Sequence, residues 1–149
     1  MTAPSGWLRE EGEAGANRNV VVWHPANKLT TSVSVLCSYA GPDIVSIGSL
    51  GTAYEFAFTM VVSQDRSGRK KNKQIATLID SQSRGGNYFV EYTIQKPDEG
   101  VYRHLYEQVA LKGDKNYNRL WTVTGIWAEG DAEDAAAVRA MVDSWKLLY

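Results

Sequence analysis

The sequence predicts an α+β fold: a central antiparallel β-sheet of about six strands, flanked by helices in an α/β/α sandwich. The main observation is period-2 alternation in three consecutive segments, at residues 87–96, 101–112 and 118–127. Their connections, 97–100 and 113–116, contain Gly, Asp, Asn and Pro, which favour hairpin turns. The three segments therefore form an antiparallel meander. Apolar residues occur on both of its faces, so both faces should be covered.

The N-terminal part supplies two more strands, and the middle of the chain supplies a third. Residues 19–24 and 31–39 are rich in Val, Trp and Tyr, which are typical of strands, and residues 74–83 alternate in the same way. Between residues 10 and 15 three glutamates are mixed with two glycines. We interpret this stretch as a short, acidic and flexible connection.

Two helices are predicted from their caps and apolar periodicity. Residues 52–64 begin with Thr52 and Glu55 at the spacing of a capping box. The second helix follows Asp131, a residue suited to capping, and has an apolar face that ends at Trp145. If the helices take opposite faces of the sheet, both apolar sides are covered.

Composition indicates one ordinary globular domain over residues 1–149. The 149 residues are 44% hydrophobic and 22% charged, and the net charge of −1 gives no general attraction to nucleic acid. No apolar run is long enough to span a membrane. The single cysteine, Cys37, excludes an internal disulfide and lies on a predicted strand, where a buried, inert thiol is expected.

The common catalytic motifs are absent from the sequence. It has no P-loop, no Gly-x-Ser-x-Gly, no Cys-x-x-Cys and no His-Glu-x-x-His. We therefore expect a protein that is not an enzyme and requires no cofactor. An enzyme with a pocket near His104 stays open as a third hypothesis.

His104 has two interpretations. It is either a histidine hydrogen-bonded on the sheet or a metal ligand paired with a carboxylate, a combination that suits zinc or manganese. Asp131 likewise is either the helix N-cap or that carboxylate, and the two roles compete. Because the meander brings both residues to one end of the sheet, we expect them close enough for a bridging ion or water. Two protein ligands would hold zinc, manganese or calcium only weakly.

A basic run follows the first helix. Its cations are Arg66, Arg69, Lys70, Lys71 and Lys73. The run is either a solvated loop or a docking patch for an acidic protein surface. It lacks interleaved aromatic residues, so nucleic acid is not an expected partner.

Several stretches together resemble the PsbP family, the extrinsic lumenal proteins of photosystem II and their PsbP-domain relatives. The resemblance covers nearly the whole chain, and it depends on the order and spacing of the motifs. These are Pro4-Ser5-Gly6-Trp7, residues 20–25, 32–35, 47–51 and 87–92, Arg103-His104-Leu105, residues 120–123 and Ser144-Trp145.

The resemblance implies a central antiparallel sheet between helices and a non-enzymatic function. It implies an extrinsic protein of photosystem II that supports the oxygen-evolving complex and retains calcium and chloride. The alternative is a PsbP-domain assembly or repair factor for a photosystem or another thylakoid complex. Expected partners are the photosystem II core and its other extrinsic subunits, at the membrane surface of the chloroplast or cyanobacterial thylakoid lumen. A metal site of some members corresponds to His104 and Asp131.

The chain departs from the family at its N-terminal end. Only Met1, Thr2 and Ala3 precede Pro4, where the family normally has part of a first strand and a functional arm. Either the sequence is a processed or partial chain, or the arm is absent, in which case ion retention would be affected.

Overall fold

The predicted meander lies in the middle of the sheet. In the computed structural model, which describes residues 1–15, 18–113 and 117–147, β5 (Asn87–Lys96), β6 (Val101–Gly113) and β7 (Asn118–Ala128) pair antiparallel in sequence order. The short 3₁₀ helix η2 (Pro97–Glu99) and Gly100, at φ +65°, make the turn between β5 and β6. The second predicted turn lies outside the described residues from position 114 to 116.

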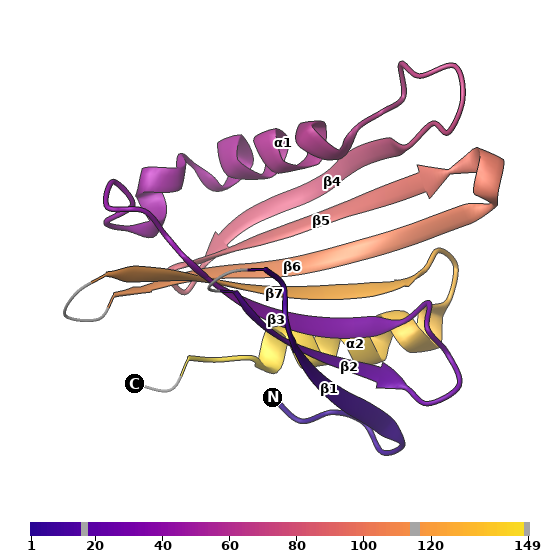
Figure 1. The fold of residues 1–149 in the computed structure, drawn as a ribbon, viewed down its shortest axis with the longest axis horizontal. Helices are drawn as coiled ribbons and strands as arrows, with labels where there is room; N and C mark the ends of the chain where they lie inside the picture. Colours follow the sequence, from indigo (N-terminus) through magenta and orange to yellow (C-terminus); the bar gives the residue numbers. More distant parts are fainter. Residues whose placement is uncertain (16–17, 114–116, 148–149) are drawn as a thin grey trace.

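Further strands extend this meander on both sides. The other strands are β1 (Trp7–Glu13), β2 (Asn19–Pro25), β3 (Ser32–Tyr39) and β4 (Ile75–Arg84). The spatial order is β1-β2-β3-β7-β6-β5-β4, and every pairing is antiparallel (Figure 1). The predicted α+β fold is confirmed.

The interpretation of the acidic stretch near the N-terminus as a flexible connection was wrong. The stretch is the edge strand β1, paired with β2 from Trp7 opposite Pro25 to Glu13 opposite Asn19, so the sheet formed by the described residues has seven strands. After Trp7 every side chain of β1 is exposed, which is why the segment lacks apolar alternation. Charged side chains are common on edge strands, where they discourage pairing with other chains.

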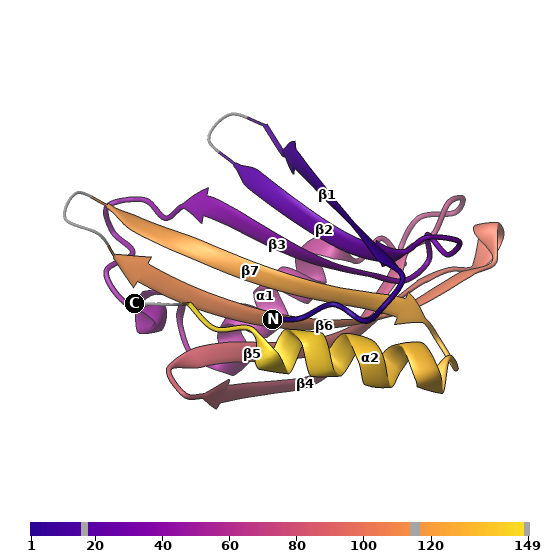
Figure 2. The ribbon, with the colours of Figure 1, turned by 90° about the horizontal axis from the view of Figure 1, so that it is seen from below.

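The two helices lie on opposite faces of the sheet (Figure 2). Helix α1 (Ala53–Gln64) packs Ala57 and Val61 against one set of sheet residues, which includes Val90 and Leu105. Helix α2 (Ala132–Ser144) packs against the neighbouring residues Phe89 and Tyr106. Successive residues of a strand point to opposite faces, so both apolar faces of the meander are covered. In the described part of the chain neither helix is long and apolar enough to cross a membrane.

Helix α2 carries several side chains of the candidate site, and it approaches β7 closely. A Cβ atom added to Gly125 of β7 would overlap Val138 and lie 3.0 Å from Cγ2 of Val142. Trp145, which follows the last turn of α2, is 8% exposed and packs beside Trp121. The buried cysteine expected at position 37 is also found.

Candidate functional site

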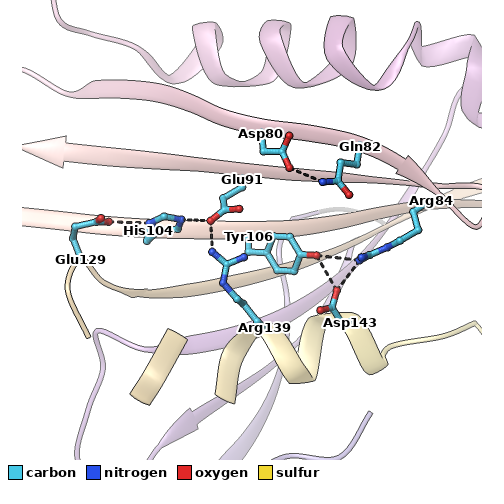
Figure 3. Close-up of polar contacts among 9 residues, drawn as sticks. All are labelled: Asp80, Gln82, Arg84, Glu91, His104, Tyr106, Glu129, Arg139 and Asp143. Carbon is cyan, nitrogen blue, oxygen red and sulfur yellow. Dashed lines mark hydrogen bonds and ion pairs between the residues drawn. The ribbon is translucent and has the colours of Figure 1, made fainter. Parts of the chain in front are cut away.

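His104 lies in a carboxylate-rich contact between the sheet and α2. Strand β6 places it opposite Trp127, and the two rings stack with centroids 4.5 Å apart. Its Nδ1 is 2.9 Å from Oε2 of Glu129, and its Nε2 is 2.6 Å from Oε1 of Glu91 (Figure 3). Carboxylates only accept hydrogen bonds, so both contacts are hydrogen bonds only when both ring nitrogens carry a proton. A metal ion bound to either ring nitrogen would replace the hydrogen bond that this nitrogen makes to its glutamate.

Glu91 connects this histidine to α2. The guanidinium of Arg139 binds Oε1 of Glu91, the same oxygen that contacts His104. Burial alone would raise the pKa of Glu91, but the hydrogen bonds from Arg139 and His104 outweigh it and lower that pKa. Arg139 also lies over the rings of Tyr106 and Trp127, with its Cζ 5.1 Å from each centroid. The sheet and the helix are therefore joined by both charge and ring contacts.

Asp131 has different partners. Its carboxylate accepts the amide N–H of Asp134 at 3.0 Å, which caps α2, and it also binds Nζ of Lys28. Lys28 binds Asp134 as well. The hydrogen bond from Lys28, followed by that of the Asp134 amide, lowers the pKa of Asp131, and these carboxylates raise the pKa of Lys28. Asp131 thus takes the capping role that one of its two interpretations gave it.

The structure brings His104 and Asp131 to the same corner but joins them to different groups. Glu129, which contacts His104, precedes Asp131 by two residues in the corner between β7 and α2. Among the described residues no cluster of three or more His, Cys, Asp or Glu side chains forms a metal site. Weak binding of a metal by His104 and Asp131 stays a prediction, in competition with these ion pairs.

A second polar cluster lies toward the other end of α2. Arg84 of β4 lies 3.1 Å from the hydroxyl of Tyr106 and 2.8 Å from Oδ1 of Asp143, and that hydroxyl also donates to Asp143 at 2.8 Å. Arg84 lies 3.9 Å above the ring of Phe89. Burial, with the hydrogen bond to Asp143, raises the pKa of Tyr106. The cluster is internally neutralised and anchors α2 to β4 and β6.

The groove between the two clusters is small. It encloses about 120 Å³ and is lined by polar and aromatic side chains that are largely paired with one another. Pockets for small molecules usually enclose roughly 300–1,000 Å³. The lining residues are Asp80, Gln82, Arg84, Phe89, Glu91, Tyr106 and Arg139. Their arrangement fits the attachment of a helix better than the binding of a substrate.

The predicted docking residues lie in the loop between α1 and β4. All five side chains are exposed. The loop is closed by a hydrogen bond from the amide of Arg66 to the carbonyl of Gln74, and the amide of Asn72 donates to Asp98 in the β5–β6 turn. Arg66 donates to two backbone carbonyls beside it. In the described part of the molecule none of the five cations forms an ion pair with a carboxylate.

Sequence reasoning missed the residues that hold His104. Glu91, Glu129 and Arg139 were not singled out, although one signal was present. Glu91 shares its strand face with Phe89, which packs beneath α2, and a carboxylate on such a face needs a partner. That partner, Arg139, lies on the predicted helix, but its contact with Glu91 depends on the position of α2 against the sheet.

Comparisons with known proteins agree with this architecture. The family model described as PsbP matches residues 1–147. A curated relative, the chloroplastic PsbP domain-containing protein 3 of Arabidopsis thaliana, is 33% identical over 99% of this chain. The chain spans 60% of that relative's length.

Two solved structures share the fold. The solution structure of cyanobacterial PsbP (CyanoP) from Synechocystis sp. PCC 6803 has a TM-score of 0.69 and 22% identity, covering 98% of this chain and 84% of that one. The crystal structure of LpqN, involved in cell envelope biogenesis of Mycobacterium tuberculosis, has a TM-score of 0.51 and 10% identity, covering 97% of this chain and 79% of that one. These two likenesses concern the fold alone. The family match along almost the whole chain, together with the identity to the Arabidopsis protein, shows that this chain belongs to the PsbP family.

Proposed function

We propose that this protein is an extrinsic, non-enzymatic protein of the thylakoid lumen that docks on photosystem II. There it supports the oxygen-evolving complex by stabilising it and by helping to retain calcium and chloride. Membership of the PsbP family supports the photosynthetic role. The observation that carries docking is the basic loop at residues 66–73, whose five cations are exposed and form no ion pair with a carboxylate in the described part of the chain.

The polar chemistry of the α2 face supports a function without catalysis. The carboxylates of Glu91 and Asp143 are paired with the guanidinium groups of Arg139 and Arg84, respectively. A general acid or base has to reach a substrate. Here these four charged groups instead form ion pairs that attach α2 to the sheet.

A PsbP-domain assembly or repair factor is the second candidate. The observation in its favour is that the Arabidopsis relative is named as a PsbP domain-containing protein. The amount of protein separates the two functions. A structural subunit should approach the abundance of photosystem II, whereas an assembly factor should be scarce and enriched in incomplete complexes.

The docking proposal predicts a salt-dependent effect of loop charges. Changing Lys70, Lys71 and Lys73 together to Gln should weaken binding to salt-washed photosystem II membranes mainly at low salt. Exposed charges are screened beyond about 8 Å at physiological ionic strength, so the difference should shrink as salt is added. Cosedimentation of the labelled protein over a salt series measures this.

A control variant removes the same number of charges elsewhere. Arg9, Arg18 and Lys146 are exposed, and their joint change to Gln should leave low-salt binding much closer to that of the wild type. If the loop variant and the wild type bind equally well at low salt, the loop is an ordinary solvated surface and does not dock.

A further inference from the structure

Helices α1 and α2 lie on opposite faces of one sheet, but their outer surfaces differ. The large side chains of α2, Val138, Met141 and Val142, are buried, and its exposed positions carry small or polar residues. That is the usual pattern for a helix that faces water on one side. Helix α2 therefore serves as an internal reference for α1.

Helix α1 is apolar on both sides. Its inner side buries Ala57 and Val61. On its outer side Tyr54, Phe58 and Val62 are 60%, 51% and 51% exposed. On a helix that faces water, large apolar side chains are normally confined to the covered side. Within the described residues the sheet covers the inner side of α1 and leaves Tyr54, Phe58 and Val62 exposed.

The three exposed residues form a straight ridge, which we call the α1 ridge. They are spaced four residues apart, so they follow one another along the helix over about 12 Å. The rings of Tyr54 and Phe58 stack, with centroids 5.9 Å apart and an interplanar angle of 27°. Rigid aromatic side chains of this kind lose little conformational entropy when a partner binds them and are enriched among interface hot spots.

The charge around the ridge is asymmetric. Glu55 lies in the first turn of α1, whereas the five cations of the basic loop follow Asp65, the C-cap residue just beyond its last turn. A complementary surface needs an apolar groove with carboxylates at the end that meets residues 66–73.

From this arrangement we propose that the α1 ridge and the basic loop form one continuous docking surface for a protein. The partner has an apolar groove that takes Tyr54, Phe58 and Val62, and carboxylates that pair with the loop. A narrow ridge fits a groove between packed protein elements, as ridges do between helices. A lipid surface is less suited, because interfacial helices carry cations beside a wide apolar face, whereas the helix side next to this ridge carries Glu55, Thr59 and Ser63, and α1 contains no Lys or Arg.

This inference deepens the proposed docking function and depends on it. The variants are Phe58→Ser for the ridge and Tyr102→Ser as a matched control, since Tyr102 is a 47% exposed aromatic residue on β6. Both positions are exposed, so the fold should be retained, and a thermal melt checks this. Binding is measured at low and high salt on two probes: salt-washed photosystem II membranes, and vesicles of equal parts phosphatidylcholine and phosphatidylglycerol.

On the photosystem II membranes, Phe58→Ser should weaken binding by about tenfold or more, the size of an interface hot spot, whereas Tyr102→Ser should bind as the wild type does. The loss should persist at high salt, because an apolar contact is not screened, in contrast to the loss from the loop variant. Wild-type binding of equal strength on the protein-free vesicles would overturn the protein partner in favour of a lipid surface.

Two further results overturn the inference and are distinguishable from each other. If Phe58→Ser binds the membranes like the wild type while the loop variant does not, the ridge is rejected and the proposed function survives. If the wild type itself binds neither probe, the proposed function fails and the docking surface fails with it.

Discussion

The close approach of α2 to Gly125 makes a sharp structural prediction. In Gly125→Ala the new Cβ atom would overlap Val138 and press on Val142, both of which are buried side chains of α2. The φ angle of Gly125 is not in the positive range that favours glycine, so the effect is steric. Helix α2 has to move away from β7, and the contacts of Arg139 with Glu91 lengthen as it does.

The expected cost follows from two opposing effects. Overpacking a core usually costs about 1–3 kcal/mol, whereas replacing Gly by Ala stabilises by about 0.4–1 kcal/mol through the unfolded chain. We expect a net loss of about 1–2 kcal/mol in the free energy of unfolding. For a chain of this size that lowers the melting temperature by roughly 2–8 °C.

Urea unfolding and a thermal melt measure this loss, and Gly12→Ala is the control. Gly12 is also a strand glycine without positive φ, but its nearest neighbour is Cγ1 of Val20, 3.8 Å from an added Cβ. The control should be unchanged or slightly more stable. Hydrogen exchange should become faster in α2 and stay unchanged in α1 for Gly125→Ala. Equal stability of Gly125→Ala and the wild type, with unchanged exchange in α2, would refute the packing argument.

Three further predictions concern buried and paired side chains. Glu107 is 6% exposed, and burial raises the pKa of its carboxyl group. The folded protein therefore holds the proton of this carboxyl group more tightly than the unfolded chain does. As the pH rises above the ordinary carboxyl pKa of about 4.3, the folded state loses stability. Glu107→Gln should therefore be more stable than the wild type at about pH 7.5 and similar at about pH 4 in urea unfolding; the same difference at both values would contradict this. Trp145→Ala should cost about 3–5 kcal/mol, because the buried ring leaves a cavity, and an unchanged melt would show that the ring contributes no packing. Calorimetric titration with zinc and with manganese should give weak binding by the wild type and none by His104→Ala; no heat with the wild type, or equal heat with both proteins, would reject a metal site.

Much of the fold could be predicted because local signals agreed with the final packing. The alternation at residues 87–127 predicted the meander. The amide of Glu55 donates to Oγ1 of Thr52 at 3.2 Å and the amide of Thr52 to Oε2 of Glu55 at 3.0 Å, which is the predicted capping box. The helices took opposite faces because both faces of the meander are apolar.

The parts that were missed depend on contacts between distant elements. Strand β1 has no apolar alternation because its side chains after Trp7 face water, and only its backbone pairing with β2 makes it a strand. At the site, the strand register places His104 opposite Trp127, near the corner that leads to Asp131. The choice of Glu91 and Glu129 as its partners is set by side-chain conformation and by the seating of α2, which no local pattern encodes.

The most direct test of the proposed role is binding of the purified protein to isolated photosystem complexes. Salt-washed photosystem II and photosystem I particles, matched for chlorophyll, would be titrated with labelled protein at low salt and then rinsed with concentrated salt. We predict saturable binding to photosystem II that approaches stoichiometric occupancy and is released by salt, with little binding to photosystem I. Equal binding to both particles, or no saturable binding to photosystem II, would contradict the account.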